Sequence, residues 1–258
     1  MKSLIAALAL ALCLYGQDAN APNYSAAGIV NGASFTNGLS PNAIGSIFGT
    51  NLAWETRALR RSDIAGNTMP TSLGNVEVYF EGWPAFLFYT SPTQINFLVP
   101  SVLLPATFQF WVARQGTRGP IVTVTLEHAS PALFQFPDGH IVSTHLDGSV
   151  VSNEAPAKAG EIIVLWATGL GNTNPDLEPG FLPYGAQWLT QMNLFGIRIN
   201  GAPIDPGLIL YAGVAPGYAG LYQINVRLPE VLPPNPEIRL TLGDTVSPAG
   251  LILAASNR

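Results

Sequence analysis

Three histidines are the first residues in this sequence that could do chemistry. His140 and His145 lie five residues apart in GHIVSTHLDGSVVS (139–152), a spacing that places them on opposite faces of one strand. Across a hairpin they could still approach Asp138 or Asp147. A zinc site needs three or four converging ligands. We therefore interpret these side chains as polar residues of an exposed hairpin and predict no metal site there.

Nucleophilic and cofactor chemistry finds little support in the sequence. It contains no Gly-x-Ser-x-Gly elbow, and its one cysteine, Cys13, lies in an apolar N-terminal run. The stretch ATGLGNT (167–173) is rich in glycine but lacks the lysine of a phosphate-binding loop, so no cofactor is predicted. Acidic residues such as Glu77, Glu81 and Asp205 fall in predicted turns or on outward strand positions. The pattern favours a protein that is not an enzyme, with no catalytic residue predicted.

One loop has a faint calcium-binding pattern. Asn172, Asn174, Asp176 and Glu178 alternate along the chain after a predicted strand, so amide or carboxylate side chains occupy every second position of these seven residues. An EF-hand needs glycine at its sixth position, where this chain has Leu177. The alternative is a solvated loop rich in turn-forming residues. We keep the four side chains as weak calcium candidates.

Two pairs of amides are candidate ligand contacts. Gln94 and Asn96 occur in one Gln-Ile-Asn strand, and Gln223 and Asn225 occur in a second. Because strand side chains alternate, each pair points away from the apolar face of its strand. Amides on an outer face could form a ligand platform, since they hydrogen-bond well to sugars and to backbone. We favour the simpler interpretation, in which they pair with neighbouring strands or with the other domain.

Aromatic residues outside clear strand interiors are a second set of binding candidates. Loop tryptophan and tyrosine are common binding anchors. They are also common plugs at the ends of β-sandwiches, and the sequence favours neither interpretation. The candidates are Trp54, Trp83, Tyr184, Trp188 and Tyr218.

The elements that must position these side chains are short strands, and their order occurs twice. Gly and Pro are frequent and scattered, and between them lie short alternating or β-branched runs such as VEVYF (76–80). NAIGSIFGTNL (42–52) aligns without a gap over GEIIVLWATGL (160–170), an offset of 118 residues. The phrase Gln-Ile-Asn-x-x-x-Pro follows in both halves, at 94–100 and 223–229.

The repeated phrase has a direct structural interpretation. Ile95, Phe97 and Val99 should face a core, as should the matching residues of the second copy. Proline ends both strands because it cannot donate to a sheet ladder. Gly82 and Gly201 precede x-Pro and suit tight hairpin turns. We predict an all-β chain of two tandem immunoglobulin-like antiparallel β-sandwiches, covering residues 22–128 and 129–258.

Six longer motifs stand out along the chain: GIVNGASF (28–35), SIFGTNL (46–52), SPTQINFLVP (91–100), LDGSVVSN (146–153), ATGLG (167–171) and LYAGVAPGYAGLYQINVRLP (210–229). In these motifs the sequence resembles the IPT/TIG branch of immunoglobulin-like domains. It resembles more closely a family of secreted proteins of unknown function from soil bacteria. The resemblance implies this fold and export, and it implies no known activity.

The N-terminus has the form of a secretory signal. Lys2 is followed by an unbroken apolar run from Leu4 to Leu14, too short to span a bilayer. We predict a signal peptide and leader over residues 1–21, a secreted, periplasmic or cell-surface location, and no membrane span in the mature chain.

Charge is sparse, at 10% of residues, and the net charge is −5. No basic stripe could neutralise phosphates, so nucleic-acid binding is not expected. The leading prediction is a non-catalytic adhesion or scaffold protein of the envelope or extracellular space, with an envelope protein or a polysaccharide as partner. One alternative is a carbohydrate-binding module that uses the loop aromatics. The other is a hydrolase with paired carboxylates at the domain seam.

Overall fold

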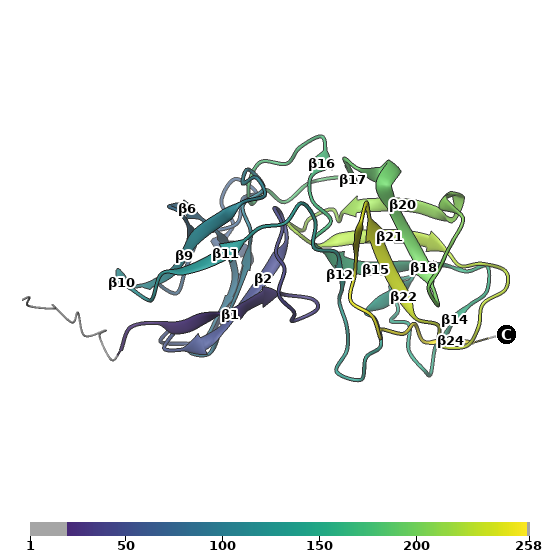
Figure 1. Ribbon diagram of the computed structural model, residues 1–258, viewed down its shortest axis with the longest axis horizontal. Coiled ribbons are helices and arrows are strands. Elements are labelled where there is room, and N and C mark those ends of the chain that lie inside the picture. Colours follow the sequence, from purple (N-terminus) through teal and green to yellow (C-terminus); the bar gives the residue numbers. More distant parts are fainter. Residues whose placement is uncertain (1–19, 257–258) are drawn as a thin grey trace, which may run out of the picture.

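The computed structural model describes residues 20–256, and these form an all-β chain of two immunoglobulin-like antiparallel sandwiches (Figure 1). Residues 1–19 of the predicted signal peptide lie outside the described residues. Packing of the first sandwich already includes Ala21, which is buried, and the carbonyl of Asn20, which accepts a hydrogen bond from Arg114. None of the helices in the described part of the chain has the length and apolarity that crossing a membrane needs.

The first sandwich packs two sheets against each other. One sheet has the strand order β1 (Asn23–Asn31), β2 (Ile44–Thr50), β8 (Gln94–Leu98), β7 (Phe86–Thr90) and β3 (Arg57–Ala58). The other has the order β10 (Thr117–Arg118), β9 (Thr107–Arg114), β5 (Val76–Phe80) and β4 (Ser72–Leu73), with β11 (Val122–Thr125) on β9 and β6 (Trp83–Pro84) on β5. A short 3-10 helix, η1 (Arg61–Asp63), follows β3.

The second sandwich repeats this plan. Its larger sheet has the order β12 (Ala132–Leu133), β15 (Ile162–Thr168), β21 (Tyr222–Arg227), β20 (Ile209–Val214), β17 (Gln187–Leu189) and β16 (Thr173–Asn174), with β13 (Ser143–His145) also on β15. The smaller sheet has the order β19 (Ala202–Pro203), β18 (Phe195–Ile199), β22 (Ile238–Leu242) and β23 (Thr245–Val246). The remaining elements are the parallel pair β14 (Ala157–Lys158) and β24 (Ala255–Ser256), η2 (Met192–Leu194) and η3 (Pro206–Leu208).

The cores form where the alternation of each strand predicts. In β5 the pattern Val-Glu-Val-Tyr-Phe buries every second side chain. Phe80, Phe97 and Phe110 pack ring against ring at the centre of the first core, with centroids 5.0 to 6.0 Å apart. The second core contains mostly aliphatic side chains, among them Ile163 of β15 and Ile224 of β21.

The predicted phase of the two Gln-Ile-Asn strands is confirmed. Ile95, Phe97 and Val99 are fully buried in the first core, and their counterparts on β21 and just beyond it are buried in the second. The predicted hairpin turns are confirmed too. Gly82 and Gly201 have φ of +91° and +81°, which a glycine adopts without a steric penalty.

Several hydrogen bonds join the two sandwiches at a junction. The backbone N–H of Ile44 donates to Oγ1 of Thr168 at 2.9 Å, and that hydroxyl donates to the carbonyl of Gly220 at 2.8 Å. Nδ2 of Asn31 donates to the carbonyl of Ser130 at 3.0 Å. These bonds bear out the expectation that the sandwiches touch. The exact boundary between residues 128 and 129 stays a prediction.

A strap formed by residues 172–189 strengthens the junction. It leaves β15, reaches the first sandwich and returns to β20 through β17 (Figure 1). On the first sandwich, Phe181 bridges Thr68, and the backbone N–H of Leu182 donates to the carbonyl of Asn67 at 2.9 Å. A small apolar cluster lies beneath the strap and joins both sandwiches; its members include Met69, Phe86, Leu98, Leu182 and Ala219.

Candidate binding surface

The two amide pairs adopt the same arrangement on the two sandwiches. Nε2 of Gln94 donates to Oδ1 of Asn96 at 2.8 Å, and Nε2 of Gln223 donates to Oδ1 of Asn225 at 2.9 Å. All four side chains are half-buried on the outer face of their sheet. In the first sandwich Ser46 of β2 also donates to Asn96, at 3.0 Å. Each pair is thus ordered mainly by a bond within its own strand.

An aromatic residue lies opposite the glutamine in each sandwich. Phe48 of β2 is the Cα partner of Gln94, and Trp166 of β15 is the Cα partner of Gln223. Directly opposed residues of antiparallel strands project from the same face. Trp166 is not among the binding candidates that the sequence predicts. The ungapped alignment of 42–52 over 160–170, which places Trp166 over Phe48, was the signal that could have found it.

Trp188 lies on the same outer face as Gln223. It is 44% exposed and packs edge-on against Tyr211, with ring centroids 4.8 Å apart. Tyr211 is buried, and its hydroxyl accepts from the backbone N–H of Gln187 at 3.0 Å and donates to the carbonyl of Val214 at 2.9 Å. Burial raises the pKa of the Tyr211 hydroxyl. Trp188 is therefore held by a neutral, fully bonded tyrosine.

The other aromatic candidates lie elsewhere. Trp54 is exposed, but the guanidinium of the buried Arg114 sits 3.6 Å from its ring centroid, and its Nε1 donates to Gln115 at 3.1 Å. Those contacts give Trp54 a role in covering a buried cation. Trp83 is exposed on β6, which belongs to the sheet opposite Phe48.

Tyr184 and Tyr218 project from two neighbouring loops near the junction. Both rings are more than half exposed. The backbone N–H of Gly217 donates to the carbonyl of Pro183 at 2.7 Å and ties the loops together. The structure therefore groups these two aromatics beside the strap, whereas Trp54 and Trp83 belong to the first sandwich.

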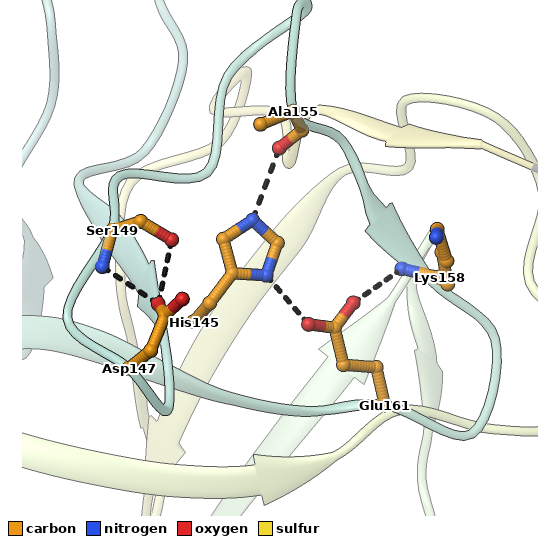
Figure 2. Close-up of polar contacts among 6 residues, drawn as sticks. All are labelled: His145, Asp147, Ser149, Ala155, Lys158 and Glu161. Carbon is orange, nitrogen blue, oxygen red and sulfur yellow. Dashed lines mark hydrogen bonds and ion pairs between the residues drawn. The ribbon is translucent and has the colours of Figure 1, made fainter.

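His145 forms a closed polar cluster (Figure 2). Its Nδ1 lies 2.5 Å from Oε1 of Glu161, and its Nε2 lies 3.1 Å from the carbonyl of Ala155. Both partners are acceptors, so both contacts are hydrogen bonds when the ring is protonated and each nitrogen donates. The hydrogen bond with Glu161 accordingly raises the pKa of His145. A ring with both nitrogens donating has no lone pair for a metal or a substrate proton.

One of the two carboxylates expected near the histidines, Asp138, contacts a histidine, whereas the other, Asp147, is bonded by Ser149. Asp147 binds Ser149 through the backbone N–H at 2.9 Å and the hydroxyl at 2.6 Å, which lowers the pKa of Asp147 (Figure 2). The carboxylate in contact with His145 is Glu161, 16 residues further along the chain. His140 lies 3.0 Å from Asp138, as the hairpin allowed. Among residues 20–256, no group of three or more His, Cys, Asp or Glu side chains could hold a metal ion.

The calcium candidates lie on the strap. Asn172, Asn174, Asp176 and Glu178 are all exposed. Asn172 and Asp176 line an open depression of about 300 Å³ at the junction, beside Asn42. Calcium binding by this loop stays a prediction. The depression contains one carboxylate, whereas the hydrolase alternative needs two that converge on one cleft.

Comparison with known proteins does not assign this chain to a family. No family model matches the chain, and no curated protein matches it. Among solved structures, it is similar to a surface glycan-binding protein from the mixed-linkage glucan utilization locus of Bacteroides ovatus, solved with a mixed-linkage heptasaccharide. The two are 10% identical with a TM-score of 0.36, over 93% of this chain and 47% of that one.

Two further solved structures are similar to this chain, with comparably low sequence identity and TM-score. A surface glycan-binding protein from Prevotella bryantii is 13% identical with a TM-score of 0.26, over 83% of this chain and 38% of that one. The I9–I11 tandem from titin is 10% identical with a TM-score of 0.24, over 86% of this chain and 65% of that one. This chain thus spans less than half the length of the two glycan-binding proteins.

Proposed function

We propose that this chain is an exported, non-catalytic binding protein that acts as an adhesion or scaffold component of the cell envelope or extracellular space. The junction carries this proposal. The two sandwiches are held as one support by hydrogen bonds and by the shared apolar cluster. The hydrogen-bond donors from the first sandwich to the second are Asn31, Ile44 and Asn67. A fixed support presents two separate surfaces at a set distance, which suits binding to an extended partner.

The use of the titratable groups supports a non-catalytic role. Both ring nitrogens of His145 are bonded, and the Asp147 carboxylate is bonded by Ser149. General acid–base catalysis needs a group within reach of a substrate proton. Export is supported by the apolar run from Leu4 to Leu14 behind Lys2.

The motif resemblance supports a finer assignment. We place the two sandwiches in the IPT/TIG branch of immunoglobulin-like domains, as folding units of residues 22–128 and 129–258. The repeated hairpin turns, Gln-Ile-Asn strands and closing prolines support this division, as does the separation of the buried residues into two main clusters.

A second candidate function is carbohydrate binding. The observation that favours it is the outer face of the second sandwich, where Trp188 and Trp166 lie on either side of Gln223. Exposed rings and amides are the groups that contact sugars: the rings stack on apolar C–H faces and the amides bond hydroxyls.

Retention measurements separate the two candidates. The purified protein would be passed over envelope fractions of the producing cell and over immobilised plant and bacterial polysaccharides. Retention on protein-bearing envelope that protease treatment of the envelope abolishes would support the scaffold proposal. Retention on one polysaccharide that Trp188→Ala abolishes would support carbohydrate binding. Retention on neither material would contradict both proposals.

A further inference from the structure

Four residues recur at matching positions on the outer faces of the two sandwiches. In the first sandwich they are Phe48, Gln94, Asn96 and Tyr89. Phe48 is the Cα partner of Gln94, and Tyr89 is the Cα partner of Asn96. Gln94 donates to Asn96 within β8. We call this set the first quartet.

The second quartet has the same pairings. Trp166 is the Cα partner of Gln223, Tyr211 is the Cα partner of Asn225, and Gln223 donates to Asn225 within β21. Even an irregularity is repeated, because the ladder shifts register just before Tyr89 in one sandwich and just before Tyr211 in the other. Such a bulge re-aims the side chains next to it. The repetition therefore extends from sequence to side-chain arrangement.

Each quartet leaves the same polar groups available to a ligand. The bond from glutamine to asparagine uses the glutamine amide nitrogen and the asparagine carbonyl. Within the described chain, the glutamine carbonyl oxygen and the asparagine NH₂ have no other partner, and both residues are partly exposed. Each quartet thus offers one acceptor and a two-proton donor, held in place by the internal bond.

Aromatic rings, some of them outside the quartets, flank these amide groups. Phe48 is 40% exposed and lies beside Phe35, which is 54% exposed, with ring centroids 6.1 Å apart. In the second sandwich, one row of Cα partners runs from Trp188 through Gly213 and Gln223 to Trp166. Gly213 contributes no side chain, and the Tyr211 hydroxyl lies over it, 2.6 Å from where a Cβ would be. The row therefore has a ring at each end, with Gln223 and the Tyr211 hydroxyl between them.

The chemistry of these faces indicates the class of ligand. The quartets contain no charged side chain, which argues against a polyanion or polycation. A pyranose ring has apolar C–H faces that stack on aromatic rings and hydroxyls that both donate and accept hydrogen bonds. We propose that the two quartets are two equivalent subsites for a neutral polysaccharide, one on each sandwich. This inference rests on the carbohydrate-binding candidate.

Two subsites on one support should bind a polymer more tightly than either alone. The protein would first be run in native gels that contain neutral glucans, mannans or xylans, with polygalacturonate as an anionic comparison. Oligosaccharides of a retarding polymer would then be titrated in a calorimeter. We expect two oligosaccharides per chain for the wild-type protein, and one for Gln94→Ala or Gln223→Ala.

Single and double variants test each subsite separately from carbohydrate binding as a whole. Each single variant should weaken polymer binding about tenfold or more through the loss of avidity, and the double variant should abolish it. Trp83→Ala removes an exposed tryptophan from the opposite sheet and should change nothing. Thermal melting would confirm that each variant is folded. Phe48→Ala and Trp188→Ala test the rings in the same way.

The outcomes distinguish the two levels of the proposal. Binding of one oligosaccharide per chain, or polymer binding that survives in the folded double variant, would overturn the paired subsites and leave carbohydrate binding standing. Retardation by none of the polysaccharides, neutral or anionic, would overturn both the subsites and the carbohydrate candidate. Retardation by polygalacturonate alone would overturn the neutral ligand class.

Discussion

Asn42 and Tyr222, 180 residues apart in the chain, meet across the junction, where Nδ2 of Asn42 donates to Oη of Tyr222 at 2.9 Å. Tyr222 is fully buried, and its hydroxyl donates in turn to the carbonyl of Gly171. Burial raises the pKa of the Tyr222 hydroxyl far above its usual range, so it stays a neutral donor. One hydroxyl on β21 thus links Asn42 of the first sandwich to the segment that follows β15.

Tyr222→Phe should destabilise the protein by about 1–3 kcal/mol, because it leaves the amide of Asn42 and the carbonyl of Gly171 without their partner. Urea unfolding of the full chain measures the loss. Tyr218→Phe is the matched control: it removes a hydroxyl from an exposed side chain and should leave the midpoint unchanged. Equal midpoints for Tyr222→Phe and the wild type would contradict this role.

The junction also depends on two glycines that have no room for a side chain. A Cβ on Gly180 would lie 2.4 Å from the ring of Phe86, and a Cβ on Gly220 would lie 2.4 Å from Leu98. Gly180→Ala and Gly220→Ala should each cost roughly 2–4 kcal/mol in the free energy of unfolding, measured in urea. Gly217→Ala has a similar positive φ with open space around it, so it should cost only about 1–2 kcal/mol. Equal losses would show that the close approach does not matter.

Substitution on the two faces of β21 should give opposite results. Ile224 is fully buried in the second core, so Ile224→Asp should cost more than about 4 kcal/mol and unfold that sandwich. Asn225→Asp keeps an oxygen to accept from Gln223 on the partly exposed face, so it should change the melting temperature little. The measurement is circular dichroism melting. Similar melting curves for both variants would contradict the strand phase.

Stability should depend on pH through His145. The bond with Glu161 raises the pKa of His145 in the folded protein above its ordinary value of 6.5. The stabilisation is therefore complete below about pH 6.5 and is lost as the pH rises through the folded pKa. For a pair worth about 1 kcal/mol, melting should occur about 2–4 °C lower at high pH.

Glu161→Gln tests the source of this pH dependence. The variant removes the carboxylate that favours the charged ring, so its melting temperature should vary less between about pH 6 and 8 than that of the wild type. Asp147→Asn is a useful comparison, because Asp147 contributes less to the raised pKa of His145 than Glu161 does. An unchanged pH profile in Glu161→Gln would show that another group is responsible.

The calcium prediction for the strap has a simple thermal test. Calcium at a concentration equal to its dissociation constant would add about 0.4 kcal/mol of stability, or about 1 °C in melting temperature. The double variant Asp176→Asn and Glu178→Gln should lose this increase. A wild-type melting temperature that does not respond to millimolar calcium would exclude the site.

The sequence alone determined the architecture because its signals are local. Alternation with a period of two assigned Ile95 and Ile224 to the cores, and Gly82 and Gly201 marked turns that only a few residues allow. The repeat then showed that the same strand order is used twice. None of these inferences requires knowing what lies across the sheet.

The tertiary structure decided which side chains meet. His145 could reach several carboxylates along the chain, and only the pairing of β13 with β15 placed Glu161 beside it. Trp166 looked like an ordinary strand residue until strand pairing put it opposite Gln223. Such contacts join residues far apart in sequence, and their geometry follows from register and sheet packing, which a local pattern does not specify.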